Sequence, residues 1–234
     1  MNKKKSFIII SVLIITALTF ILCFGSIKNG TALSSEFPKT KIILDAGHGG
    51  IDAGVSGVNT GVKESELNLM IVKKLERYLV DAGFEVRLTR STDAGLYGLA
   101  TTSRKKKDME KRRQIIEKFK PNLVVSVHLN KYSLSTRRGA QVFFNEKSEN
   151  GKILAEHVQQ AFNELEESTR HFSALRGDYY IIKCSEYPSI IAECGYLSNP
   201  EEEKLLLTEE YQGKIAYSIF KGIVGYVAQT TITE

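Results

Sequence analysis

The sequence predicts a single α/β domain in three layers, with a mostly parallel central sheet flanked by helices, preceded by one N-terminal transmembrane or signal helix. Strand-like apolar runs alternate with helical periodicity from residue 41 onward, and an uncharged apolar stretch lies near the N-terminus. Of the 234 residues, 42% are hydrophobic and 25% are charged, which is enough to bury one sizeable core. This composition excludes a disordered or fibrous protein.

The N-terminal stretch from Phe7 to Phe24 holds 18 residues without a charge. As a helix it would be about 27 Å long, close to the ~30 Å hydrocarbon core of a bilayer. Three lysines at positions 3–5 precede it, so the positive-inside rule sends the rest of the chain out of the cytoplasm. We interpret residues 1–25 as a membrane anchor or signal segment. We favour the uncleaved anchor, because most secretory signals have a shorter apolar stretch of about 7–15 residues; a cleaved signal and a secreted protein stay the alternative.

Residues 26–40 mix Gly, Ser, Thr and Pro without periodicity, as a linker does, so the domain is expected over residues 41–230. Lys41–Asp45 (KIILD) is an apolar run before a Gly-rich loop, which favours a buried strand. Apolar residues then recur at spacings of four, four and three from Leu67, which predicts a helix over Ser65–Ala82. The further expected elements are a strand at Phe84–Leu88, a helix at 109–119, strands at Leu123–Val127 and Ala140–Phe144, a helix at 151–166, strands at Tyr179–Ile182 and Ser189–Ala192, and a helix at Glu210–Val227.

The charge distribution argues against a nucleic-acid partner. The formal net charge is +5, but without residues 1–25 it is 29 minus 27, or +2. Binding to a phosphate backbone needs clustered Lys and Arg. The basic run 104–113 (RKKKDMEKRR) is interpreted as the solvated face of a helix, with a grip on anionic polymer or lipid headgroups as the alternative.

Side chains that can bind a metal follow three expected strands or precede the first helix. His48 follows KIILD, His128 follows LVVSV and Glu193 follows SIIA, while Glu64 comes just before the first helix. In open α/β sheets, sites form at the carboxyl ends of the strands. Two His and a carboxylate, with a fourth position left for water, are a common set of ligands for a catalytic zinc ion. Burial of Glu193 after an apolar strand is costly without a partner, so it is expected to have a cation nearby or a catalytic role.

Four motifs in this order resemble those of the zinc-dependent N-acetylmuramoyl-L-alanine amidases. They are Asp45–Gly50 (DAGHGG), Lys63-Glu64 before an amphipathic helix, Ser126–Asn130 (SVHLN) and Ala192–Pro200 (AECGYLSNP). The resemblance covers residues 41–228. It implies that His48, Glu64 and His128 bind one zinc ion and that Glu193 is the catalytic carboxylate. Arg112, which aligns with an Arg recurring in the family, and Asn130 are expected to support the site.

The resemblance also implies a function and a location. The reaction would be hydrolysis of the amide bond between N-acetylmuramic acid and L-alanine in peptidoglycan, outside the cytoplasm. A single anchor before a bare catalytic domain is the layout of the spore-cortex members, which implies a role in forming muramic-δ-lactam and a place between the forespore membranes. Peptidoglycan, the membrane and an activating protein are the expected partners. Two alternatives stay open: a zinc peptidase using the same ligands, and a wall-binding module without turnover.

Overall fold

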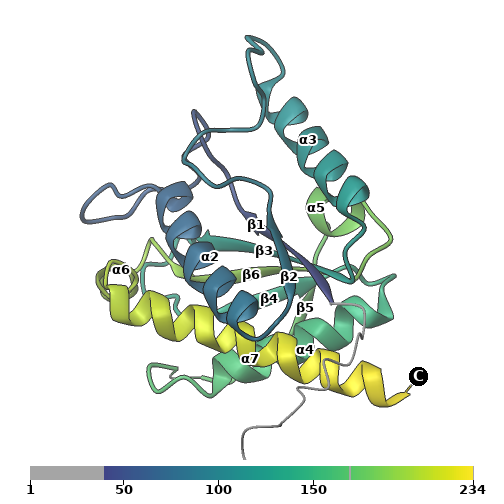
Figure 1. Cartoon of the computed structure of the whole chain (residues 1–234). Coiled ribbons are helices and arrows are strands. Elements are labelled where there is room, and N and C mark those ends of the chain that lie inside the picture. Colours follow the sequence, from purple (N-terminus) through teal and green to yellow (C-terminus); the bar gives the residue numbers. More distant parts are fainter. Residues whose placement is uncertain (1–39, 169, 234) are drawn as a thin grey trace, which may run out of the picture. The chain divides into compact units, whose positions relative to one another are not determined.

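A six-stranded sheet in the order β2-β1-β3-β6-β4-β5 forms the centre of the computed structural model, which describes residues 40–168 and 170–233 (Figure 1). The strands are β1 (Lys41–Ala46), β2 (Glu85–Leu88), β3 (Leu123–Asn130), β4 (Gln141–Phe144), β5 (Leu175–Arg176) and β6 (Ser189–Tyr196). The helices are α2 (Glu64–Asp81), α3 (Arg104–Phe119), α4 (Glu149–Asn163), α5 (Tyr180–Lys183), α6 (Pro200–Leu206) and α7 (Glu209–Thr233).

The prediction of a mostly parallel sheet is confirmed, with one antiparallel pair. Strand β1 runs parallel to β2 and β3, β3 parallel to β6, and β4 parallel to β5, whereas β4 runs antiparallel to β6. Two parallel strands that follow each other in the chain need a crossover connection of about a dozen residues or more. The loop 131–140 between β3 and β4 is shorter than that and contains no helix, so β4 enters the sheet in the opposite direction.

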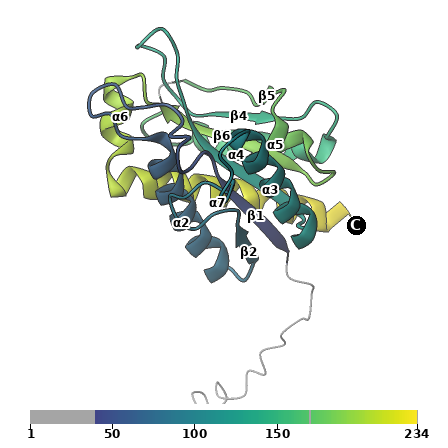
Figure 2. The ribbon, with the colours of Figure 1, turned by 90° about the horizontal axis from the view of Figure 1, so that it is seen from above.

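Helices cover both faces of the sheet, as predicted (Figure 2). Alternate residues of a strand point to opposite faces. Ile42 and Leu44 of β1 belong to the larger apolar cluster, which includes residues of α2, α4 and α7. Ile43 between them packs into a second cluster with Ile116 of α3 and with α5. The domain therefore has three layers.

The prediction of a strand at Tyr179–Ile182 was wrong, because this segment forms the short helix α5. Ile181 and Ile182 are both buried there, and a short apolar run does not distinguish a strand from a buried helical turn. Strand β5 and helix α6 were not predicted. The sequence does contain an N-terminal signal for helix α6. The Asn199 side chain caps it by accepting from the backbone N–H groups of Glu201 and Glu202, and Pro200 is its first residue.

Several predicted elements extend further than expected. Strand β3 continues through Asn130 and β6 through Tyr196, so His128 and Glu193 lie within strands instead of after them. Helix α3 begins at Arg104 and includes the whole basic run. Helix α2 begins at Glu64, which is therefore its first residue.

The predicted anchor at residues 1–25 and all but the last residue of the predicted linker at residues 26–40 lie outside the described residues. Within residues 40–168 and 170–233, no helix combines the length and the apolar character that a membrane crossing requires.

Candidate metal and catalytic site

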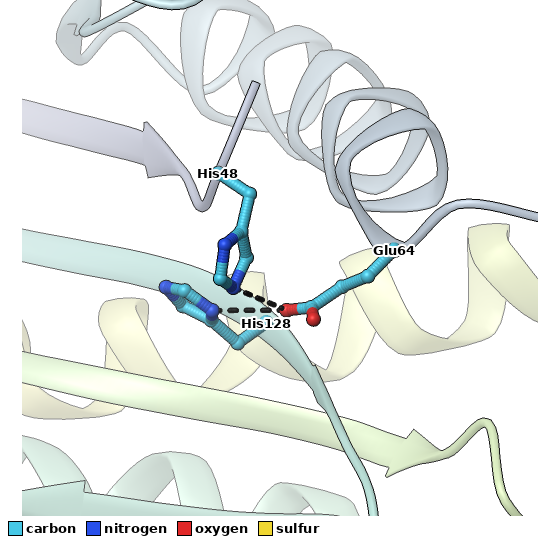
Figure 3. A group of neighbouring side chains, drawn as sticks. All are labelled: His48, Glu64 and His128. Carbon is cyan, nitrogen blue, oxygen red and sulfur yellow. Dashed lines mark hydrogen bonds and ion pairs between the residues drawn. The ribbon is translucent and has the colours of Figure 1, made fainter. Parts of the chain in front are cut away.

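Three of the predicted site residues meet at one point above the carboxyl ends of β1 and β3 (Figure 3). His48 Nε2 lies 3.3 Å and His128 Nδ1 lies 3.0 Å from the same oxygen, Glu64 Oε1. The three donor atoms lie within 4.8 Å of one another. Three residues that span 80 positions of the chain, from His48 to His128, thus direct two imidazoles and one carboxylate to a common centre.

The local sequence explains how these side chains converge. Strands β1 and β3 are neighbours, so the loop after β1 carries His48 close to His128 of β3. His48 has a left-handed backbone with φ of 61°, which turns the chain sharply. Gly47 leaves the room that the second ring needs, because an added Cβ there would lie 2.2 Å from His128 Cε1.

Glu64 is held in place from several sides. It is only 2% exposed, and its carboxylate accepts from the backbone N–H groups of Val55 (2.9 Å) and Leu129 (3.1 Å) and from Asn68 Nδ2 (3.2 Å). Although burial raises its pKa, the hydrogen bonds and charges of His128 and His48 bring the pKa of Glu64 well below its ordinary range. It therefore stays an anion inside the protein.

The donor set fits a divalent metal such as zinc. Two ligand atoms about 2.0–2.1 Å from one tetrahedral ion lie about 3.3–3.4 Å apart, close to the two donor distances found here. A buried carboxylate between two imidazoles also needs a positive partner. In the metal-free protein, a proton on His48 supplies this positive charge. Burial lowers the pKa of His48, but the larger combined effect of Glu64 and Asp52 raises it to about 9.

Asp52 is a neighbour of the site that the sequence did not single out. Its Oδ1 lies 2.9 Å from His48 Nδ1, within ion-pair distance, although the alignment falls short of a hydrogen bond. A carboxylate beside the second ring nitrogen is a common way to orient a metal-binding His. Its position four residues after His48 is a signal that could have identified it.

Glu193 faces the same cavity from the neighbouring strand. It is the register partner of His128, and both residues line a pocket of 740 Å³. Its Oε2 is shielded from solvent and has no hydrogen-bond partner among the described residues. Burial raises the pKa of Glu193 to about 7. A carboxyl group with such a pKa can accept and return a proton near neutral pH.

Arg112 and Asn130 both line this pocket. Arg112 is 1% exposed; it pairs with Asp45 and Asp108 and donates to the backbone carbonyl of His48 at 2.7 Å. The Asn130 side chain accepts from the Lys131 N–H at 2.8 Å. The basic run is thus split, because Arg112 points inward while Lys106, Lys107 and Lys111 are exposed.

Arg90 is a buried residue near the site that sequence reasoning missed. It is 4% exposed and donates to the carbonyl groups of Ala46 and Gly47, both at 2.8 Å. Its place just after strand β2, at the same edge of the sheet as His48, was the available signal.

Fold and donor set together define an α/β protein with the site of a metal-dependent hydrolase. Residues 42–224 match the family model described as N-acetylmuramoyl-L-alanine amidase, and the chain therefore belongs to this family of peptidoglycan amidases, which hydrolyse the bond between N-acetylmuramic acid and L-alanine. This confirms the expected enzyme class over a peptidase or a non-catalytic wall-binding module.

Relatives support the family assignment over most of the chain. The germination-specific N-acetylmuramoyl-L-alanine amidase of Bacillus subtilis (strain 168) is 33% identical over 192 residues, covering 80% of this chain and 80% of the relative. The CwlD amidase of Clostridioides difficile, solved in complex with the GerS lipoprotein, superposes with a TM-score of 0.78 at 36% identity, covering 81% of this chain and 99% of that one. A second amidase structure, from Clostridium difficile 630, has a TM-score of 0.73 at 26% identity, covering 81% and 97%.

Proposed function

We propose that this amidase is a zinc enzyme in which His48, Glu64 and His128 hold the ion and Glu193 is the catalytic base. The observation that carries the proposal is the convergence of the three donors, with Glu193 in register beside His128 in the same pocket. A zinc ion held at this point would act as a Lewis acid toward the amide carbonyl and would lower the pKa of a water molecule to about 7.

Glu193 is the group that moves the proton. It accepts a proton from the attacking water as the water oxygen bonds to the lactyl carbonyl carbon. When the carbon–nitrogen bond breaks, the same proton passes to the nitrogen of L-alanine. The second proton of the water stays on the new carboxyl group until it passes to solvent or to the amine, so the products are a lactyl carboxylate on the sugar and a stem peptide with a free amino group. His48 and His128 would not serve as bases, because each would use its lone pair to hold the ion.

The remaining pocket residues hold the ligands and leave space for the substrate. Backbone N–H groups of Val55 and Leu129 hold the Glu64 carboxylate in place, and Asp52 lies beside the second nitrogen of the His48 ring, where it orients the ring. Gly47 and Gly49 of the loop after β1 line the pocket without side chains, which supports room for a bulky glycan.

We further propose that the chain acts in the maturation of the spore cortex. Support comes from its similarity to a germination-specific amidase and to the CwlD amidase. In this role the enzyme strips stem peptides from N-acetylmuramic acid, and a separate deacetylase then allows muramic-δ-lactam to form.

The proposed setting is the outer side of a membrane. Residues 1–25 would form the anchor, residues 26–40 the linker and residues 41–230 the catalytic domain. Because the CwlD structure contains the GerS lipoprotein, we propose that an activating lipoprotein is the partner class of this chain.

The experiment is mass spectrometry of peptidoglycan fragments incubated with the full chain and zinc, beside a chelated sample and Glu193→Gln. Stem peptides with a free N-terminal L-alanine, found only in the active sample, support the amidase. Cleavage within the stem peptide instead would contradict it. The cortex role is tested by the muramic-δ-lactam content of spores from a strain that lacks this chain, and an unchanged content would refute that role.

A further inference from the structure

The backbone of His48 adopts a conformation that needs outside support. With φ of 61° it lies in the left-handed region, where side chains other than Gly are uncommon. Two glycines with positive φ, Gly49 and Gly50, follow directly. Such a loop keeps one shape only when the surrounding structure holds it.

Two buried guanidinium groups supply this hold, and we call them the arginine clamp, Arg90 and Arg112. Arg90 Nε donates to Ala46 O and its Nη2 to Gly47 O, both at 2.8 Å. Arg112 Nη1 donates to Ala46 O at 2.9 Å and its Nη2 to His48 O at 2.7 Å. The clamp thus binds three consecutive carbonyl groups, which end with that of His48 itself.

The arginine clamp also ties this loop to the elements around it. Arg90 Nη2 donates to Ser65 O at 2.8 Å, so one guanidinium joins the His48 loop to the first turn of α2, where Glu64 lies. Arg112 pairs with Asp45 on β1 and with Asp108 on its own helix. The spacing between His48 and Glu64 is therefore set through Arg90 as well as through the two side chains.

The chemistry of these contacts requires arginine. A guanidinium is a rigid plane with five N–H donors, whereas a lysine ammonium is a compact charge on a flexible stem. Arg90 binds four carbonyl oxygens, those of Ala46, Gly47, Ser65 and Thr92, and has no ion pair with a described residue. Its role is therefore to arrange backbone groups.

We propose that Arg90 and Arg112 are positioning residues that hold the His48 loop in its metal-binding shape before the ion arrives. The inference rests on the proposed zinc site, since it concerns how His48 is presented to that ion. Among the described residues, no hydrogen bond or ion pair joins either arginine to the side chain of His48, Glu64 or His128, so the clamp reaches these ligands through the backbone of residues 46–48 and of Ser65.

The first test measures zinc affinity and the visible spectrum of bound Co²⁺ in full-length Arg90→Lys and Arg112→Lys. Loss of a group that orients a metal ligand weakens metal binding by about 10–100-fold, and we expect that range here, with a changed Co²⁺ spectrum. Arg113→Lys on the same helix is the matched control, because the Arg113 side chain is 38% exposed and pairs with Glu117. Leu79 is buried in the core at the far end of α2, so Leu79→Ala is a control for lost stability. We expect this variant to keep full zinc affinity.

Wild-type affinity and an unchanged Co²⁺ spectrum in both folded arginine variants would overturn the inference. A second test does not depend on the variants: hydrogen exchange in the metal-free wild type. The Gly49 N–H donates to Asp52 O at 2.8 Å and the Gly50 N–H to Asp93 O at 2.5 Å, and the clamp predicts that both are protected without zinc. Fast exchange that slows only with zinc would show that the ion shapes the loop. If the wild type binds no zinc at all, the proposed metal site fails, while the exchange test still decides whether the clamp orders the loop.

Discussion

His128 and Glu193 face each other as register partners on the neighbouring parallel strands β3 and β6. Side chains at paired positions leave the same face of a sheet, so the proposed zinc ligand and the proposed base point into one pocket. Strand pairing, and not a loop, fixes their separation. Substituting one of them is therefore expected to leave the position of the other unchanged.

Glu193→Gln is expected to keep zinc and lose hydrolysis. Glutamine has nearly the same shape but does not accept the proton, so kcat should fall by ~10²–10⁴-fold. The zinc content of the purified variant and its turnover of peptidoglycan fragments are the two measurements. Retained turnover would remove Glu193 from the role of base.

His128→Ala is expected to lose both zinc and hydrolysis. The substitution removes one of three donors to the proposed ion, and Glu64 loses the imidazole 3.0 Å from its Oε1. Metal analysis after dialysis checks this directly. His157→Ala is the control, because His157 contacts Gln229 far along the chain and does not line the pocket. A zinc content equal to that of the wild type would exclude His128 as a ligand.

Gly47→Ala tests the close approach of the loop to the His128 ring. The added Cβ would lie 2.2 Å from His128 Cε1, so the ring must move and zinc affinity should fall by about tenfold or more. Gly213→Ala in helix α7 is the matched control, since nothing lies within 4 Å of its added Cβ. That change should raise the free energy of unfolding by about 0.5–1 kcal/mol and leave zinc binding alone. Equal zinc affinity in both variants would contradict the packing described here.

Zinc affinity should rise with pH because His48 binds zinc only without its proton. The pKa of His48 is raised to about 9 in the metal-free protein, so zinc displaces a proton at any lower pH. Between pH 6 and 8 the apparent affinity should increase by about tenfold per pH unit from this residue alone. Competition with a chelator of known affinity at each pH measures the slope. An affinity independent of pH would mean that His48 is not a ligand.

Asp45 should make stability depend on pH in the acid range. Burial raises its pKa, but the charge of Arg112 and hydrogen bonds from Ser126 and Thr89 lower it from 3.8 to about 2. Its contribution is thus complete above pH 3.8 and is lost as the pH falls through 2, which amounts to about 2 kcal/mol. Urea unfolding of the zinc-free chain at pH 5, 4, 3 and 2 measures this loss.

Asp45→Asn should abolish that acid step and also lower stability at pH 7, by about 3–5 kcal/mol, because it breaks a buried ion pair with Arg112. Asp81→Asn, on the exposed end of α2, should retain the step. An acid step of the same size in both variants would assign it to another carboxylate.

The order of the elements and the grouping of the site residues were predictable because both depend on local signals. Helical spacing from Leu67 predicted α2, and polar residues after apolar strands pointed to His48, His128 and Glu193. The carboxyl ends of neighbouring parallel strands lie at the same edge of the sheet. An α/β fold class therefore predicts that residues at these ends lie close together.

The parts that could not be predicted depend on contacts between distant segments. The position of Arg90 just after a strand indicates that it lies near the site, but only the fold shows that it binds carbonyl groups from the loop after β1. Tyr179–Ile182 was misassigned because four residues are too few for periodicity to distinguish a strand from a helical turn. Burial against α3 decides the outcome there.

The proposed donors come from positions 48, 64 and 128 and the proposed base from position 193, so the site draws on most of the chain. No contiguous fragment shorter than 146 residues, counted from 48 to 193, contains all four. With these proposed roles, a nascent or partly folded chain lacks a complete centre, and we expect no hydrolysis before β6 has paired with β3. For an enzyme that cuts the wall of its own cell, this requirement would keep incompletely folded chains from damaging the wall.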